Sequence, residues 1–421
     1  MRVSRQRLLI GIVVSCLWGM SALGQMQSQV DESGLGGMMA SGQSRAQKDE
    51  PGPPWRLSLE VGGVFTDNRD AAKTNKQSNL DVTAEPRADF RYQDADRTWV
   101  ELSLMPLLKW HSNPRTELEG GKQQETELFG AVGLELMHRL TPHMKLNAGD
   151  QLAYNDDPQL LDNGTTLRRN QSYILNDMHA GLESAFTAES GLNLLGEAVT
   201  TRYQDEVMAK ELNSDQYRGE MDPYVIVGDD LKLIGLAGAS EFHEETTERN
   251  RGSAVETYQA GVEKSFTPGL VGKTLGGYQF IQYDNSAIGP AGTLSGNAEL
   301  VFLAKAPTRF RFNIGYGYAV PSDSAYSAQK ATTISWAVDH DVIADRLIFH
   351  FDGLFRDGHY AREAVDAPGG KESMTLIGLH CTYFVTPKWS LTGGYSLENW
   401  DSTVRDSFTR NLVDLSVKTV W

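Results

Sequence analysis

Apolar and polar residues alternate along much of the chain between Trp55 and Trp421. Residues 309–320 show this most clearly: every second position is phenylalanine, isoleucine, tyrosine or valine, and the positions between are arginine, asparagine, glycine or alanine. Residues 347–355 alternate in a similar way. A period of two is typical of a β-strand whose two faces meet different surroundings. The pattern therefore predicts strands with one apolar and one polar face.

About 18 such segments can be counted, and 16 is the alternative because the segments near Lys232 and Thr293 are weakly patterned. The predicted strands begin at Trp55, Asn79, Thr98, Thr126, Lys145, Ser172, Leu192, Gln216, Lys232, Val255, Lys273, Thr293, Arg309, Ala331, Leu347, Glu372, Trp389 and Ser407. This number of regularly spaced strands predicts an all-β fold, namely a single antiparallel up-and-down transmembrane β-barrel.

The connectors between these segments alternate between short and long. The short ones, most of which carry proline, glycine or aspartate in turn positions, are residues 92–97, 140–144, 187–191, 227–231, 266–269, 304–308, 339–346 and 385–388. The long ones, such as residues 67–78, 111–124, 155–171, 204–214, 244–252, 321–330 and 361–371, are polar. Outer-membrane barrels have short periplasmic turns and longer external loops. An even strand count places both ends of the barrel, and all the short turns, on the periplasmic side.

After the N-terminus no apolar run approaches the roughly 18 residues that a membrane helix needs. The mean hydropathy of −0.39 is low, which fits a membrane barrel because lipid-facing apolar residues alternate with polar residues facing the lumen. A soluble β-sandwich could bury the same apolar faces. The loop asymmetry and the N-terminal segment favour a barrel in the bacterial outer membrane.

Residues 1–24 have the features of a secretory signal peptide of a Gram-negative bacterium. Arg2, Arg5 and Arg7 precede an apolar core, and small residues end the segment before Gln25. Residues 25–54 are rich in Gln, Ser, Gly and Met without periodicity, and we expect a disordered periplasmic leader before the barrel of residues 55–421. Cleavage would leave Cys381 as the single cysteine, so no disulfide is expected.

The final strand, residues 407–421, has Val413, Leu415 and Val417 on one face and ends on Trp421. It resembles the C-terminal signal strand of outer-membrane barrels, so Trp421, Val417 and Leu415 are the predicted assembly signal, with the barrel-assembly machinery, outer-membrane lipids and lipopolysaccharide as expected partners. Aromatic side chains are stable at both membrane–water interfaces, where they form two girdles around a barrel. The candidates for these two girdles are Trp55, Trp99, Trp110, Tyr318, Trp389, Trp400 and Trp421.

The formal net charge is −16, and loss of the signal arginines makes it about −19, which argues against nucleic acid as a partner. The carboxylates either decorate solvated loops or form a vestibule that favours cations. The polar faces give eight candidates for lining the lumen: Arg309, Arg311, His350, Asp352, Arg356, Arg410, Asp414 and Lys418. These charges either line a hydrated pore or pair across strands within a partly filled lumen.

Several stretches carry a family resemblance: the opening strand at residues 55–68, the Thr-Pro strand exits at 266–268 and 385–387, the segment 150–161, and the end of the chain from 395 to 415. On these motifs, residues 55–421 resemble bacterial outer-membrane β-barrels of the putative β-barrel porin-2 type. The resemblance implies the fold and the outer-membrane location. It implies no catalytic residues, no binding residues and no cofactor.

Two stretches contain residues that could form a catalytic or a metal site. Outer-membrane phospholipases separate a histidine and a serine by one residue on a strand, whereas His111 and Ser112 are adjacent and would point to opposite faces. His138, His179, His350 and His380 lie singly on different strands. Glu241, His243, Glu244, Glu245 and Glu248 could hold a divalent cation, although a solvated acidic loop is the preferred interpretation. We therefore expect neither an enzyme nor a metal site.

The function that fits these features is a porin-like channel for passive diffusion of small hydrophilic solutes. One alternative is an export barrel for a polysaccharide or another polymer, which a continuous basic track through the lumen would favour. Another is a plugged structural or adhesive barrel.

Overall fold

The computed structural model describes residues 54–68, 73–74, 76–94, 97–113, 125–155, 159–160, 166–167, 172–204, 209, 213–244, 252–284, 289–303, 307–319, 329–344, 346–360, 369–403 and 407–421. The predicted signal peptide, and the predicted leader except for its last residue, lie outside this part of the chain. Among the described residues, no helix is long and apolar enough to cross a membrane.

Most of the described residues lie in strands. Their bounds are β1 Trp55–Thr66, β2 Asn79–Asp94, β3 Thr98–His111, β4 Thr126–Thr141, β5 Met144–Asn155, β6 Gln159–Leu160, β7 Thr166–Leu167, β8 Tyr173–Ala185, β9 Ser190–Tyr203, β10 Ser214–Val227, β11 Leu231–Glu244, β12 Gly252–Thr267, β13 Leu270–Tyr283, β14 Ala291–Phe302, β15 Thr308–Ala319, β16 Gln329–Ile343, β17 Leu347–Tyr360, β18 Lys371–Thr386, β19 Trp389–Ser402 and β20 Phe408–Val420.

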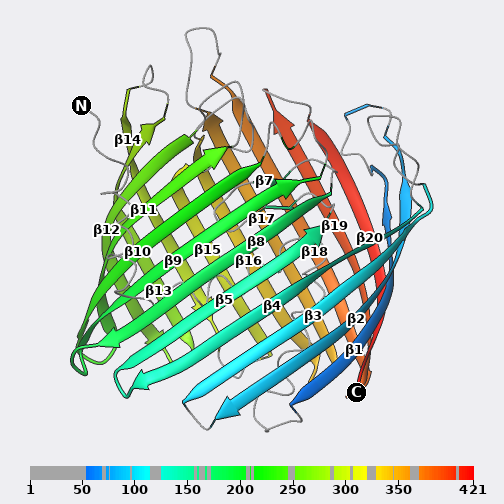
Figure 1. The fold of residues 1–421 in the computed structure, drawn as a ribbon, viewed down its shortest axis with the longest axis horizontal. Coiled ribbons are helices and arrows are strands. Elements are labelled where there is room, and N and C mark those ends of the chain that lie inside the picture. The colour runs from blue at the N-terminus through cyan, green and yellow to red at the C-terminus, as the bar shows by residue number, and fades with distance from the viewer. Residues whose placement is uncertain are drawn as a thin grey trace.

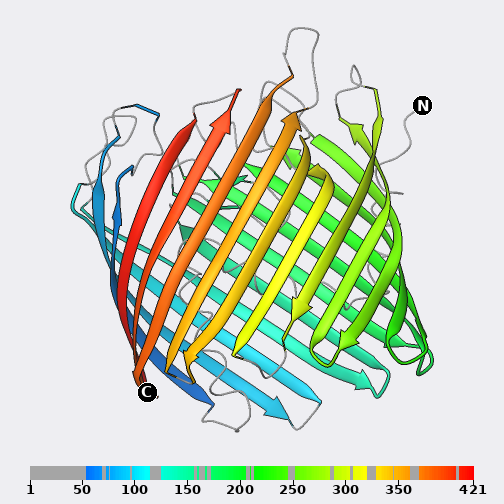
Figure 2. The same ribbon diagram turned by 180° about the vertical axis from the view of Figure 1, so that it is seen from behind.

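Eighteen of these strands form one closed antiparallel sheet, in which each strand pairs with its neighbours along the chain (Figure 1). The wall continues on the far side through the later strands, drawn in yellow to red (Figure 2). Closure comes from β1 and β20, which pair from Ser58 opposite Val420 to Thr66 opposite Leu412. The predicted 18-stranded barrel is confirmed, and both the count of 16 and the soluble sandwich are wrong. The pair β6–β7 forms a separate two-stranded sheet that the sequence pattern did not predict.

The short turns share one end of the barrel with the C-terminus (Figure 1). Two of them contain a threonine followed by a proline and form the same hydrogen bond. The Thr141 hydroxyl accepts a hydrogen bond from the backbone N–H of His143 at 3.2 Å, and the Thr386 hydroxyl accepts one from Lys388 at 3.2 Å. The strand register shifts just before each turn. Proline fixes one backbone dihedral and the hydroxyl satisfies a turn N–H, so the local sequence determines where the strand reverses.

Several predicted boundaries shift by up to three residues. The predicted connector 339–346 is mostly strand, because β16 continues to Ile343 through a register shift after Asp341. A bulge of this kind accommodates one extra residue without ending the strand. Likewise β12 begins at Gly252, three residues before Val255, and β20 begins at Phe408, one residue after Ser407.

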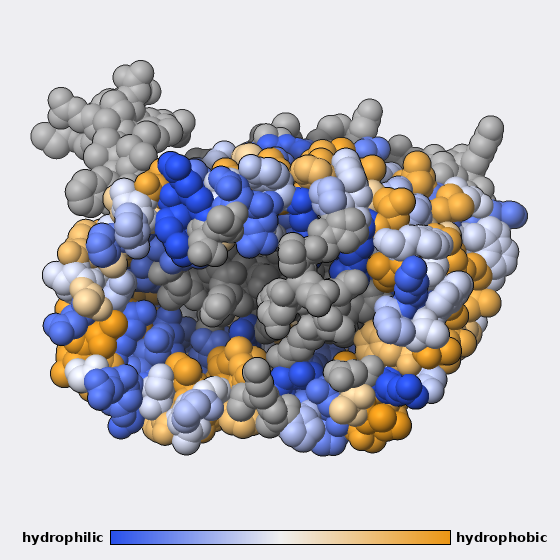
Figure 3. Space-filling model, turned by 90° about the horizontal axis from the view of Figure 1, so that it is seen from below, coloured by the Kyte–Doolittle hydropathy of each residue, from blue (hydrophilic) through white to orange (hydrophobic). Residues whose placement is uncertain are grey.

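The two faces of the wall differ as the alternation predicts. Phe312, Ile314 and Tyr316 on β15 are exposed, and so are Val413, Leu415 and Val417 on β20. The residues on the opposite face of β20 include buried Arg410, Asp414 and Ser416. Seen from the end with the short turns, the molecule is hollowed, with hydrophilic side chains around the hollow and hydrophobic ones on the flanks (Figure 3). The polar faces therefore point inward and the apolar faces outward.

One of the residues expected in the interfacial girdles lies elsewhere. Trp55, Trp110, Trp389 and Trp421 are exposed near strand ends, but Trp400 is buried. Trp400 is an odd number of residues from the outward-facing Trp389, so it belongs to the inner face of β19. Its ring stacks on that of Phe408, with centroids 5.8 Å apart, and both pack with Met374. The assignment of Trp400 to a girdle was wrong.

Replacement of Leu415 by arginine tests the outer face. Leu415 lies mid-strand on β20 and its exposed fraction is 58%. A charge near the bilayer midplane costs about 2–4 kcal/mol, whereas one near the interface costs about 0–1 kcal/mol. We expect Leu415→Arg to lower the free energy of unfolding by the larger amount, measured by urea titration of the protein folded in lipid vesicles.

Val385→Arg is the matched control, because Val385 is 59% exposed but lies one residue from the end of β18. Equal losses of stability in the two variants would contradict the assignment of Leu415 to the lipid-facing belt.

Candidate functional site

The inner face of the barrel carries a set of ion pairs between neighbouring strands. Arg410 on β20 lies opposite Glu398 on β19, and its Nη2 is 2.7 Å from Glu398 Oε2, with both side chains buried. Lys418 lies opposite Glu60 on β1, with Nζ 3.6 Å from Oε2. Directly opposite residues of antiparallel strands have side chains close enough to interact. The register of β19, β20 and β1 therefore pairs these charges.

The β14–β16 wall repeats this arrangement. Arg309 on β15 has Nη2 2.8 Å from Asp341 Oδ1 on β16, and Arg311 has Nε 3.4 Å from Glu299 Oε1 on β14. Arg356 on β17 donates a hydrogen bond of 2.6 Å to Gln329 Oε1. Each basic residue predicted to line the lumen thus has an acceptor on a neighbouring strand, which fits the pairing interpretation of the sequence.

Two histidines form a second group on the inner face. His350 on β17 and His380 on β18 lie directly opposite each other, with ring centroids 6.4 Å apart. His350 Nδ1 is 2.6 Å from Asp339 Oδ1 and its Nε2 is 3.4 Å from Asp352 Oδ1. His380 Nδ1 lies 3.6 Å from Asp414 Oδ1. These histidines lie singly on different strands in the sequence, but the strand register brings them together with three carboxylates.

Two glycines make room for this row of side chains. A Cβ atom on Gly378 would lie 2.5 Å from Asp352 Oδ1, and one on Gly394 would lie 2.5 Å from Asp414 Oδ1 and closer still to His380 Nδ1. Real Cβ atoms do not approach other atoms so closely. The imidazole and carboxylate groups therefore lie flat across strands that have no side chain at these positions.

The eight predicted residues do not converge on one point. His350 and Asp352 are in contact, Asp414 joins them only through His380, and Arg309, Arg311, Arg356, Arg410 and Lys418 belong to separate pairs. The partners that the sequence analysis did not identify are Glu60, Glu299, Gln329, Asp339, Asp341, His380 and Glu398. Their alternation was visible, but identifying them required the register of each strand pair.

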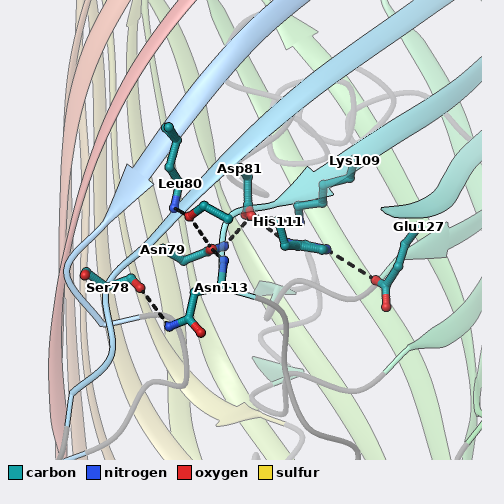
Figure 4. A network of polar contacts seen from close by, with 9 residues as sticks. Ser78, Asn79, Leu80, Asp81, Lys109, His111, Asn113 and Glu127 are labelled. Carbon is teal, nitrogen blue, oxygen red and sulfur yellow. Dashed lines mark hydrogen bonds and ion pairs between the residues drawn. The ribbon is translucent and has the colours of Figure 1, made fainter. Parts of the chain in front are cut away.

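His111 belongs to a polar network at the end of β3 (Figure 4). The next residue, Ser112, bonds to the same part of β2. His111 Nδ1 is 2.5 Å from Asp81 Oδ1 and its Nε2 is 3.5 Å from Glu127 Oε2. The Ser112 hydroxyl accepts a hydrogen bond of 2.9 Å from the backbone N–H of Leu80. Both imidazole nitrogens therefore contact carboxylates, whereas the Ser112 hydroxyl bonds to Leu80 and Asn79 of β2.

The acidic segment 241–248, a possible cation site, lies only partly within the described residues. His243 Nε2 lies 3.2 Å from Glu241 Oε1, and its Nδ1 lies 3.6 Å from Asp284 Oδ2. Glu245 and Glu248 lie outside the described residues. Within the described part of the chain, no group of three or more His, Cys, Asp or Glu side chains could hold a metal ion.

The family model described as "Putative beta-barrel porin 2" matches residues 236–420. The C-terminal part of the chain resembles these porins. The resemblance predicted from the sequence is confirmed over this range, and together with the closed barrel it confirms the expected location in the outer membrane. The search of curated proteins found no match.

Solved structures with a similar chain path include outer-membrane proteins of Pseudomonas. OccK5 (OpdH) of Pseudomonas aeruginosa is 12% identical over 87% of this chain and 98% of its own, with a TM-score of 0.47. OpdK of the same species is 13% identical over 87% and 99%, with a TM-score of 0.47. A BenF-like porin of Pseudomonas fluorescens Pf-5 is 11% identical over 87% and 99%, with a TM-score of 0.48.

The two neighbouring glycines of β19 test the packing of the inner row. Gly394→Ala would push a methyl group against His380 and Asp414, and overpacking of this kind costs about 1–3 kcal/mol. In Gly393→Ala the new Cβ would lie 3.7 Å from Leu415 Cδ1, an ordinary contact. We expect a lower unfolding free energy for Gly394→Ala and little change for Gly393→Ala, measured by urea titration. Equal effects would contradict the described packing of His380 and Asp414.

Proposed function

We propose that this protein is an outer-membrane channel through which small hydrophilic solutes diffuse passively. The observation that carries the proposal is the closed 18-stranded wall with charged and polar side chains on its inner face. Barrels of 16 to 18 strands are wide enough to leave an aqueous passage. The proposed role is that of a conduit, and it requires neither a cofactor nor a chemical step.

The paired charges favour a channel through which solutes pass, rather than a barrel that holds one ligand permanently. In the described wall, Arg309, Arg311, Arg410 and Lys418 each lie beside a carboxylate, so these cations are compensated in place. A hydrated wall of alternating sign interacts weakly with most small solutes and admits them without tight binding. Because these basic residues are paired, they do not form the continuous basic track that export of an acidic polymer would favour.

The outer face supports insertion by the barrel-assembly machinery into a membrane containing lipopolysaccharide. Val417 and Leu415 are exposed on the lipid-facing side of β20, beside the seam with β1, and Trp421, which follows β20, is exposed as well. This placement suits a signal strand that is recognised before the barrel closes. The indole of Trp421 would then lie in the periplasmic interfacial layer.

Single-channel recording in a planar bilayer tests the proposal. We expect stable conductance steps, and a reversal potential in a salt gradient that shifts toward cation selectivity in Arg311→Glu and Arg356→Glu, because each replaces a positive charge of the inner wall by a negative one. Stable but silent barrels would contradict the channel function.

Arg202→Glu is the matched control for these variants. Arg202 lies opposite the exposed Ile174 on the outer face and forms an ion pair of 2.8 Å with Asp215. We expect its selectivity to equal that of the wild-type protein. An unchanged reversal potential in all three variants would remove Arg311 and Arg356 from the conduction pathway.

A further inference from the structure

A cavity of about 300 Å³ lies against the inner wall formed by β9 to β15. Its lining includes the apolar side chains of Leu236 on β11 and of Leu275 and Ile281 on β13. Leu275 and Ile281 are buried, with exposed fractions of 5% and 0%. Next to this apolar surface the lining is charged, so the cavity offers a ligand two different kinds of contact.

Besides Glu241 on β11, three further acidic residues line the same cavity from two neighbouring strands, β9 and β10. Glu220 and Asp222 lie two residues apart on β10 and therefore share its inner face, and Glu197 on β9 lies opposite Arg218. Arg218 Nε donates a hydrogen bond of 2.7 Å to Glu220 Oε1, and its Nη1 lies 3.5 Å from Glu197 Oε2. One guanidinium group thus serves two carboxylates and leaves the third, Asp222, without an ion pair among the described residues.

The unused acceptor atoms point to a ligand that donates hydrogen bonds. Within the described part of the chain, the buried oxygens Asp222 Oδ1, Glu220 Oε2 and Asn297 Oδ1 have no hydrogen-bond partner. The exposed fraction of Asp222 is 5%, so its carboxylate has little contact with bulk water. A buried acceptor without a partner costs free energy, and a bound donor would recover it.

The other basic side chain of the lining is already surrounded by acids. Lys273 on β13 lies opposite Glu263 on β12 and opposite Glu299 on β14. Its charge acts on Asp222 as well as on Glu299. The carboxylates Glu197, Glu220 and Asp222 outnumber the cations Arg218 and Lys273 in the lining, which favours a cation over an anion in this cavity.

A glycine on the neighbouring strand leaves space for one of these carboxylates. Gly238 on β11 lies opposite Glu220, and a Cβ atom there would lie 3.1 Å from Glu220 Cγ. The glycine therefore lets the Glu220 side chain lie across β11, beside Leu236. Pro223 follows Asp222, and because proline has no N–H it makes no ladder hydrogen bond to β11 at that position.

We propose that this cavity binds a small organic cation, with an ammonium or guanidinium group at Asp222 and Glu220 and a short aliphatic body against Leu236 and Leu275. Charge-assisted hydrogen bonds would hold the cationic end, and burial of the aliphatic part would add affinity. As a statement about which solutes the channel selects, this rests on the proposed function. The binding itself is measurable without conduction.

Isothermal titration of the full-length mature protein, folded in detergent micelles, tests the site with n-butylammonium chloride as the probe. We expect saturable binding at one site, and none of comparable strength for butyrate or n-butanol. Loss of one hydrogen bond to a charged group weakens binding by about tenfold or more. We expect at least that loss in Asp222→Asn and in Glu220→Gln.

Asp414→Asn is the matched control. Asp414 lies on β20, across the barrel from β10, with an exposed fraction of 7% and, among the described residues, a carboxylate oxygen without a hydrogen bond. This variant should bind n-butylammonium as the wild-type protein does. Electrophoresis without heating, which distinguishes folded from unfolded barrels by mobility, shows whether each variant is folded.

Three results would overturn the site: no saturable binding by the folded wild-type protein, equal binding of butyrate, or equal weakening in Asp414→Asn and Asp222→Asn. Recording conductance from the same preparation separates the two proposals. Conduction without binding contradicts only the cation site, and binding without conduction contradicts only the channel.

Discussion

Every backbone N–H and C=O group within a bilayer must find its hydrogen-bond partner inside the protein, since the hydrocarbon offers none. In this chain the requirement is met by the seam between β1 and β20, because an open sheet of the same strands would leave two edges unpaired in lipid. The residues that close the barrel are separated by nearly the whole sequence. The first and last strands are therefore as important to the membrane-spanning structure as any pair of neighbours.

Closure produces two surfaces with opposite requirements. The outer one meets lipid and carries exposed apolar side chains, whereas the inner one encloses charges that must be compensated at short range. The register does this by pairing Arg410 with Glu398 and Arg311 with Glu299 across single strand boundaries. The β9–β15 wall departs from this balance, because Asp222 has no ion pair among the described residues and lies in a cavity that is also lined by apolar side chains. The combination of an uncompensated carboxylate and an apolar surface distinguishes this cavity from the rest of the described wall.

The sequence was sufficient for the features that depend on short stretches of chain. Alternation predicted the strands and their faces, and Thr-Pro turns such as Thr386-Pro387 predicted where they reverse. The face of Trp400 was also predictable, because counting from Trp389 places it inward. The contact of His350 with His380 and the cavity at Asp222 depend on the register of neighbouring strands. Short bulges alter this register, and the sequence of one strand alone does not determine it. The pairing partners could therefore be identified only when the strands were placed side by side.

The Thr-Pro turns also affect how such a wall can change in evolution. Because Thr141 and Thr386 form the same local hydrogen bond in different hairpins, the turn depends little on the strands that it joins. A hairpin with such a turn is a self-contained unit of two strands. Adding or deleting one would change the circumference by a whole hairpin while keeping the first and last strands antiparallel, so pore width could vary in even steps without redesign of the seam.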